Sequence, residues 1–322
     1  MVEIANYKKN MKNLRYICCQ PATPYYTWQI EVMINNFIKM GVNPQLMDIV
    51  CGIENDIIPN EWITLRDSYS SVRFFFYNDT RENKAYAPAI YFNLMKQHIV
   101  SAPEIQNDVL MMHDCDIVLT KQPTVFNTML DDKVWYLSDT KFYINYDYVI
   151  SKGEDLYNNM CQIVGIDPLI PKLLNSNSGG AQYMVKDTTF EFWEKVERNS
   201  IELYDYFCSV EHLYTKKHDM DYPIQKWTAG MWSFLWNAWY FGHETIVNGR
   251  MGFGWVTNTY DDVYRYTILH NAGVLDGNSG LFFKGDYTTQ LPYNEELNID
   301  ERRATSFYWK EIQETAKKSV LL

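Results

Sequence analysis

One apolar stretch, Val109–Pro123, is interrupted at its centre by two carboxylates, and it constrains the fold more than any other segment. The apolar run stops at His113–Asp116 and then resumes, a pattern that predicts a buried strand presenting polar groups at its end. Asp114 and Asp116 are two residues apart, so an extended chain points them to one face and a turn can bring both onto one ion. Their oxygens suit Mg²⁺ or Mn²⁺, and two solvated aspartates in a turn are the simpler alternative.

Composition narrows the class of protein. The chain has 322 residues, of which 47% are hydrophobic and 16% aromatic, and this is ample for the core of one large α/β domain. A formal net charge of −11 argues against general attraction to nucleic acid or anionic membranes. A local basic groove is still compatible with this net charge. No apolar run approaches the roughly twenty residues of a membrane-spanning helix. With no recognisable signal peptide and no paired cysteine spacing, we expect a soluble cytoplasmic protein of a microbe or infected host cell, with reduced thiols and no membrane partner.

The order of apolar segments predicts the fold class: α/β, with an open, mostly parallel sheet flanked by helices. We expect residues 1–13 to be a lead-in, residues 14–290 to form a single domain, and residues 291–322 to add a helical C-terminal extension. Thr27 is the expected cap of the first helix, which Gly41 ends. Strands are predicted at 14–19, 45–51, 72–77, 134–137 and 182–185, with one strand interrupted by its carboxylates within 109–119. Helices are predicted at 28–40, 87–100, 147–167 and 190–208, and the tryptophan spacing within 219–242 describes a helix face.

Several polar residues follow these predicted strands directly. Ligands of open α/β sheets bind at the carboxyl ends of the strands, so such residues are expected to share one edge. The candidates there are Gln20, Pro21, Ala22 and Thr23 after the first strand, Asp79 and Arg81 after the third, and Asp114 with Asp116.

Two later segments carry further candidates. The loop Asn177–Gly180 is small and ends in two glycines, so it lets the backbone approach a ligand closely with unusual φ angles, or it is an ordinary turn. Three tryptophans at 232, 236 and 239 have helical spacing and are expected in the core, whereas Trp227 is left open between core and a platform for a sugar or base.

The final candidates are His270 and Lys284, each at the end of a short apolar stretch. A histidine in this position is either a hydrogen-bonded structural residue or an imidazole ligand that completes a Mn²⁺ site with two carboxylates. Lys284 is a point charge suited to a phosphate group.

These segments together resemble a known family. His113–Asp116, the Asn177–Gly180 loop, His270 with Gly273, and Lys284 are similar to the metal-dependent nucleotide-sugar glycosyltransferases of the A-type (GT-A, Rossmann-like) fold. The segment Pro24–Gln29 looks more narrowly like hydroxyproline O-arabinosyltransferases and peptidyl-serine galactosyltransferases. That plant-type family is secretory and membrane-anchored, so an anchorless microbial, viral or phage member is the expectation for this chain.

The resemblance implies a role for each candidate. A single GT-A domain would bind Mn²⁺ (or Mg²⁺) through Asp114, Asp116 and His270, with Asp114 and Lys284 also at the diphosphate of a UDP-sugar. Retaining chemistry needs no protein base, because the leaving phosphate takes the acceptor proton, whereas inversion needs a carboxylate, for which Asp139 and Asp221 are the candidates. The nucleotide would lie against Gln20, Pro21, Ala22 and Thr23, with Asp79 and Arg81 nearby, and the donor sugar and acceptor against Asn177, Ser178, Gly179, Gly180 and Trp227.

The implied function is transfer of a hexose or pentose to an acceptor hydroxyl on a glycan, a protein or a hydroxymethylated base of phage DNA. Two other functions remain open. A nucleotidyltransferase would bind a nucleoside triphosphate through the same carboxylates, but no glycine-rich phosphate loop follows the first strand. A noncatalytic carbohydrate-binding protein would use the aromatic residues and leave Asp114, Asp116 and His270 unexplained.

Overall fold

A seven-stranded sheet forms the centre of the computed structural model, which describes residues 12–214, 223–274, 276 and 280–322. Its strands are β1 (Leu14–Pro21), β2 (Met47–Ile53), β3 (Arg73–Asn78), β4 (Val109–Met112), β6 (Trp135–Leu137), β7 (Tyr183–Val185) and β8 (Thr245–Val247). Their order is β3-β2-β1-β4-β7-β6-β8. Strands β1 to β4 run parallel, and within this sheet only β7 is antiparallel to both of its neighbours. The predicted α/β class with an open, mostly parallel sheet is confirmed.

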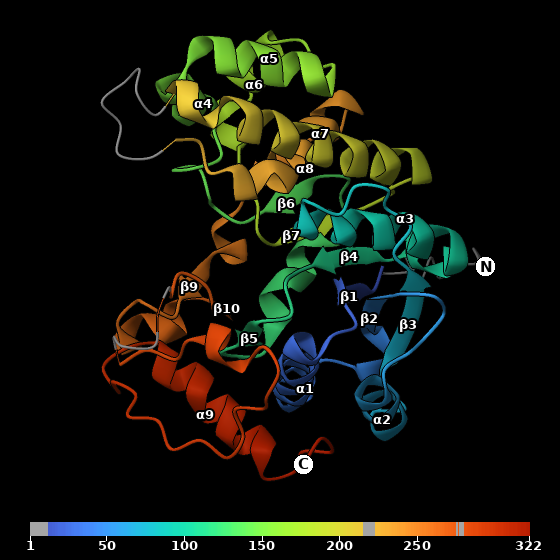
Figure 1. Ribbon diagram of the computed structural model, residues 1–322, viewed down its shortest axis with the longest axis vertical. Helices are drawn as coiled ribbons and strands as arrows, with labels where there is room; N and C mark the ends of the chain where they lie inside the picture. The colour runs from blue at the N-terminus through green and yellow to red at the C-terminus, as the bar shows by residue number, and fades with distance from the viewer. Residues whose placement is uncertain (1–11, 215–222, 275, 277–279) are drawn as a thin grey trace, which may run out of the picture.

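Helices cover both faces of the sheet (Figure 1). Helices α1 (Pro24–Lys39) and α2 (Asn60–Ser68) pack on one face, and α3 (Ile90–Ser101), α7 (Phe190–Tyr214) and α8 (Ala229–Tyr240) on the other. Farther out from the sheet, α4 (Tyr146–Lys152), α5 (Glu154–Val164) and α6 (Leu169–Leu173) extend this second layer. Helix α2 was missing from the sequence-based prediction.

The start of α1 also differs from the prediction. The helix begins at Pro24 and is capped by Thr23, four residues before the expected cap at Thr27. Proline suits the first helical position because its φ is preset and it has no N–H to leave unpaired. The hydroxyl of Thr27 instead donates a hydrogen bond to the Thr23 carbonyl at 3.1 Å, inside the helix.

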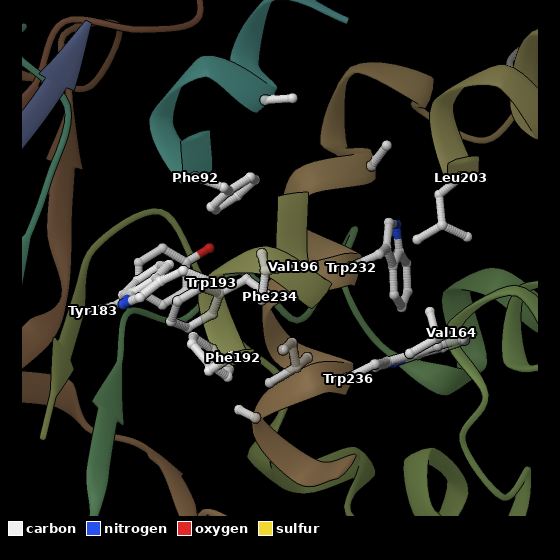
Figure 2. Close-up of a cluster of buried hydrophobic side chains, with 14 of the residues drawn as sticks. Phe92, Val164, Tyr183, Phe192, Trp193, Val196, Leu203, Trp232, Phe234 and Trp236 are labelled. Atoms are coloured by element: carbon white, nitrogen blue, oxygen red, sulfur yellow. The ribbon is translucent and has the colours of Figure 1, made fainter. Parts of the chain in front are cut away.

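The layer formed by α7 and α8 is rich in aromatic side chains. Figure 2 shows rings from both helices meeting in one buried cluster, including Trp232 and Trp236, whose ring centroids are 5.5 Å apart with near-perpendicular planes. Trp232, Trp236 and Trp239 are 0%, 1% and 5% exposed, which confirms their predicted place in the core. Trp227 is 61% exposed and lies outside it.

A second, three-stranded sheet stands beside the first. It consists of β5 (Ile117–Leu119), β10 (Ile268–His270) and β9 (Phe253–Trp255), with β10 in the middle, antiparallel to β5 and parallel to β9. The predicted strand does stop at its carboxylates, but residues 117–119, which were expected to resume it, pair in the second sheet. The turn His113–Asp116 takes the chain out of the main sheet and into the second one, so the two aspartates lie at the junction between the sheets.

The C-terminal segment packs against α1. Helix α9 (Thr305–Ala316) shares a buried cluster with Trp28 and Val32 of α1. Glu31, fully buried in α1, accepts hydrogen bonds from the Tyr293 hydroxyl at 2.6 Å, the Ser319 hydroxyl at 2.7 Å and the Val320 N–H at 2.8 Å. The helical C-terminal addition is present, and the proposed domain boundary at residue 290 stays a prediction.

A buried ion-pair network lies near the amino-terminal ends of the first strands. Arg15 of β1 contacts Asp48 of β2 (Nη1 to Oδ1, 2.9 Å) and Asp108 (Nη2 to Oδ2, 2.7 Å). His98 of α3 reaches the other oxygen of Asp48 at 3.0 Å, and Arg73 approaches Asp48 at 3.3 Å. Because buried charges need partners, this network fixes the register of these elements at the edge opposite Asp114 and Asp116.

All six cysteines have free thiols. Within the described ranges, no helix has the length and apolar character needed to cross a membrane.

Candidate active site

Two carboxylates and an imidazole converge where the two sheets meet. Asp114 and Asp116 lie in the turn between β4 and β5, and His270 is the last residue of β10. The Nε2 atom of His270 is 3.3 Å from Asp114 Oδ2 and 3.2 Å from Asp116 Oδ1. One ligand atom from each of the three side chains lies within 4.8 Å of the other two, close enough for all three to bind one ion.

Lys284 completes this cluster from the side. Its ammonium group contacts Asp116 Oδ2, so the other oxygen of that carboxylate is the one that faces His270. The turn that carries Lys284 is anchored to α1, because the Trp28 indole N–H donates a hydrogen bond to the Tyr287 carbonyl at 3.1 Å. The predicted grouping of Asp114, Asp116, His270 and Lys284 in space is what the structure shows.

The charges in the cluster shift one another's pKa values. Burial opposes ionisation of Asp116, but the neighbouring Lys284 and His270 outweigh it and hold the pKa of this carboxyl well below its ordinary value. Withdrawal from water, together with the charge of Asp116, raises the pKa of Asp114. Burial alone lowers the pKa of His270, yet the two aspartates overcome this and raise it.

These donors fit a hard divalent cation. Carboxylate oxygens with one imidazole nitrogen suit Mn²⁺ or Mg²⁺, whereas zinc sites typically use more nitrogen or sulfur. In the part of the chain that the structure describes, no other group of three histidine, cysteine or acidic side chains is arranged in this way. The three residues can therefore hold the metal that the sequence predicted.

Three adjoining cavities lie in this region, and the cluster lines two of them. The central one, of about 550 Å³, is lined by Asp114, Asp116, His270 and Lys284, and also by Gln20 and Pro21. A second cavity of about 410 Å³ shares Pro21 with it and lies over the carboxyl ends of β1 to β3, with Ala22, Thr23, Asp79 and Arg81 in its wall. A third cavity of about 230 Å³ shares Asp114, His270 and Trp227 with the central one. We call them the central, strand-end and aromatic cavities.

In the strand-end cavity, Asp79 and Arg81 are bound to each other. Arg81 Nε lies 2.9 Å from Asp79 Oδ1, and Arg81 Nη2 lies 2.9 Å from Asp79 Oδ2. Arg81 Nη1 donates a hydrogen bond to the Tyr86 carbonyl at 2.8 Å. Although burial works in the opposite direction, hydrogen bonds from Arg81 lower the pKa of Asp79. The pair thus braces the loop before α3, and its predicted contact with a donor nucleotide stays a prediction.

The Asn177–Gly180 loop has a structural reason for its glycines. A methyl group on Gly179 would overlap the Ser138 carbonyl oxygen, and one on Gly180 would lie 2.6 Å from Met231 Cε. Contrary to the expectation of unusual φ angles, the residue with a left-handed conformation is the next one, Ala181, at φ 71°. The loop residues Asn177, Ser178, Gly179 and Gly180 are absent from the lining of the three cavities, whereas Ala181 and Tyr183 line the aromatic cavity.

Changing Gly179 to alanine should therefore lower the free energy of unfolding by about 1–3 kcal/mol, the usual range for overpacking. Equilibrium urea denaturation measures this change. Gly249→Ala is the matched control, because no atom lies within 4 Å of a methyl group built there. Equal stability of the two variants would show that the loop yields easily and that packing against Ser138 does not explain Gly179.

One of the two candidate bases, Asp139, is not brought to the cluster. Asp139 is exposed, accepts a hydrogen bond from the Lys141 N–H at 3.1 Å, and lines none of the three cavities. Asp221 falls within residues 215–222, outside the described part of the chain. Their catalytic roles stay predictions.

Sequence reasoning missed several residues that line the cavities. Tyr25 and Gln29 enter the central cavity from the first turns of α1, and Tyr91 enters both it and the aromatic cavity from α3. The available signals were the position of Tyr25 directly after the first predicted strand and the family resemblance of the Pro24–Gln29 segment, to which no role was assigned. Nothing in the sequence marks Tyr91, because an aromatic residue in an amphipathic helix is usually part of the core.

Searches against models of protein families and against curated proteins found no match. Among solved structures, the WbbM bifunctional glycosyltransferase matches at 9% identity and a TM-score of 0.45, covering 95% of this chain and 52% of WbbM, so this chain spans about half of that protein. The galactosyltransferase LgtC matches at 12% identity and 0.41, covering 95% of each chain. Mouse xyloside xylosyltransferase 1 matches at 10% identity and 0.41, covering 83% of this chain and 98% of that one. What the site can do is decided by this chain's own residues.

Proposed function

We propose that this protein is a metal-dependent glycosyltransferase that moves a hexose or pentose from a UDP-sugar to an acceptor hydroxyl. One observation carries the proposal: Asp114, Asp116, His270 and Lys284 meet in the wall of the central cavity, which adjoins the other two. A nucleotide sugar consists of a nucleoside, a charged diphosphate and a sugar, in that order. A charged cluster in the central cavity, with the strand-end cavity on one side and the aromatic cavity on the other, matches this order. The family resemblance in the sequence supports the same conclusion.

In this proposal Asp114, Asp116 and His270 hold Mn²⁺ (or Mg²⁺), which when bound neutralises the negative charge that develops on the departing diphosphate. Lys284 adds a second positive charge next to Asp116, fixed in place before substrate arrives. The nucleoside occupies the strand-end cavity, against Pro21, Ala22 and Thr23, with Gln20 at its border. Asp79 and Arg81 shape the floor of that cavity rather than supplying free charges.

The lining of the cavities also bears on the stereochemistry. Among the described residues that line the central and aromatic cavities, the only carboxylates are Asp114 and Asp116. Since both are assigned to the metal, neither is free to take a proton from the acceptor. This favours the route in which the leaving phosphate takes that proton, which is retention of configuration.

A thermal-shift panel tests the proposal directly. UDP at a hundred times its dissociation constant should add about 2.7 kcal/mol of apparent stability, and only when Mn²⁺ is present. A Mn²⁺-dependent shift with UDP but not with ATP supports the proposal. A shift confined to nucleoside triphosphates would favour the nucleotidyltransferase, and no shift with any nucleotide would reject both.

The raised pKa of His270 predicts how metal affinity depends on pH. A proton on His270 competes with the ion, so Mn²⁺ affinity should fall as pH is lowered through that raised pKa, by up to about tenfold per pH unit. The fall should begin at a higher pH than an ordinary histidine would give. Mn²⁺ titrations followed by electron paramagnetic resonance at pH 8 and pH 6 measure it.

The variant His270→Ala keeps both carboxylates but loses the competing imidazole. Its Mn²⁺ affinity at pH 8 should be lower than that of the unaltered protein by at least about tenfold, and should change less between pH 8 and pH 6. An unchanged titration curve would make His270 a structural residue.

A further inference from the structure

The aromatic cavity has walls unlike those of its two neighbours. The rings of Tyr86, Tyr143, Tyr183, Trp227 and Trp255 line it, together with Met112 and Met231. They come from six separate parts of the chain, so the cavity is a product of the tertiary fold. Aromatic faces beside phenol hydroxyls bind groups that have one apolar face and polar edges.

Its ionisable groups lie on one side only. Apart from tyrosines, the described lining contains His113, Asp114 and His270, and no lysine or arginine. The Nδ1 atom of His113 donates a hydrogen bond to the Asp114 carbonyl at 2.9 Å. Asp114 and His270 already belong to the metal cluster. The described lining therefore offers no lysine or arginine side chain to neutralise a charged ligand.

An exposed tryptophan lines both this cavity and the central one, and its backbone is anchored. The Tyr86 hydroxyl donates to the Trp227 backbone carbonyl at 2.7 Å and accepts the Gly230 N–H at 2.8 Å, while its ring stacks on Tyr204 with centroids 4.7 Å apart. The Tyr86 and Trp227 rings meet edge to face at 5.9 Å. Trp227 is 61% exposed, so much of its aromatic surface is open to a ligand in these cavities.

We infer that the aromatic cavity binds the acceptor and that the acceptor is an uncharged saccharide ring, stacked on Trp227 with its hydroxyls toward the tyrosine phenols. The inference rests on the proposed function and names the acceptor class for that same site. The cavity of about 230 Å³ has the volume of about eight water molecules, which is room for one ring. A polynucleotide acceptor would need cationic side chains for its phosphates, and the described lining has none.

Saturation-transfer difference NMR tests this with defined probes. The unaltered protein, with Mn²⁺ and UDP present, is mixed with a panel of neutral methyl hexopyranosides and pentopyranosides, with methyl glucuronide and with 5-hydroxymethyldeoxycytidine. At least one neutral glycoside should receive saturation, strongest at the protons of one ring face. Methyl glucuronide should receive at least fivefold less.

Two variants and a control locate the binding. Trp227→Ala should reduce the signal at least fivefold, and Met231→Trp, which fills the cavity, should do the same. Tyr240→Ala is the matched control, since Tyr240 is also an exposed aromatic residue but lines none of the three cavities. Its signal should equal that of the unaltered protein, and all three variants are first checked for a native circular dichroism spectrum.

The outcomes separate the two proposals. Mn²⁺-dependent UDP binding without any neutral glycoside signal, or with a signal that Trp227→Ala and Met231→Trp leave intact, overturns the acceptor inference while the glycosyltransferase proposal stands. A preference for 5-hydroxymethyldeoxycytidine overturns it in favour of a modified DNA base. If both variants weaken UDP-sugar binding relative to UDP and spare the glycosides, the cavity holds the donor sugar and the inference is wrong. If the unaltered protein does not bind UDP in the presence of Mn²⁺, the proposed function itself is rejected.

Discussion

Replacing Asp116 with asparagine is expected to abolish Mn²⁺-dependent binding of UDP and to lower sugar transfer by at least about 10²–10³-fold, the scale of removing one group that stabilises developing charge. Asp116 is the residue that contacts both basic side chains of the cluster, His270 through one oxygen and Lys284 through the other. The amide keeps the shape of the side chain but loses its negative charge, so it binds a divalent cation poorly. Isothermal titration with UDP, with and without Mn²⁺, measures the effect.

Asp67→Asn is the matched control for this substitution. Asp67 is an exposed carboxylate of α2 that pairs with Arg66 and lines none of the three cavities. Its UDP binding should equal that of the unaltered protein. If Asp116→Asn retained Mn²⁺-dependent UDP affinity with a native circular dichroism spectrum, the cluster would not be the site that binds the metal for UDP.

The second large effect concerns stability. Asp48→Asn should lower the free energy of unfolding by about 3–5 kcal/mol, the usual cost of breaking a buried ion pair by removing one partner. Asp48 is fully buried and is shared by Arg15, Arg73 and His98. The neutral amide leaves the buried guanidinium of Arg15 with one charged partner, Asp108, and the neutral carbonyl of Gln45. Urea denaturation followed by circular dichroism gives the change.

The exposed pair Arg66 and Asp67 again supplies the comparison. Asp67→Asn should change stability by no more than about 1 kcal/mol, because water and salt screen a surface ion pair. A loss below about 1 kcal/mol for Asp48→Asn would mean that the network is hydrated or relaxes around the amide.

The metal cluster was largely predictable from the sequence because its parts are local signals. Asp114 and Asp116 interrupt an apolar strand, and His270 and Lys284 each follow a short apolar stretch. Parallel strands place their carboxyl ends on one edge, so residues after different strands meet without any further information. The same rule placed Pro21, Ala22 and Asp79 around the strand-end cavity.

Other features depend on contacts that no local pattern encodes. Helix α2 buries only Trp62 and Leu65, too few apolar positions to give a helical period. Residues 109–119 looked like one interrupted strand, because the segments on both sides of the carboxylates are apolar. Only tertiary pairing assigns these segments, β4 and β5, to different sheets. The aromatic cavity is assembled from segments far apart in sequence. For Gly179 the sequence allowed either close approach to a ligand or an ordinary turn. In the structure the group that approaches Gly179 closely is the Ser138 carbonyl.

The bonds around Glu31 have a consequence for how the protein is made. Glu31 lies in the first helix of the chain, yet its buried carboxylate accepts hydrogen bonds from Tyr293, Ser319 and Val320, between 262 and 289 residues later. During synthesis α1 therefore cannot reach its final burial until those residues have left the ribosome. Contacts of such long sequence separation also slow folding. Since α1 carries Tyr25 and Gln29 into the central cavity, the last step of folding and the completion of the site should be the same event.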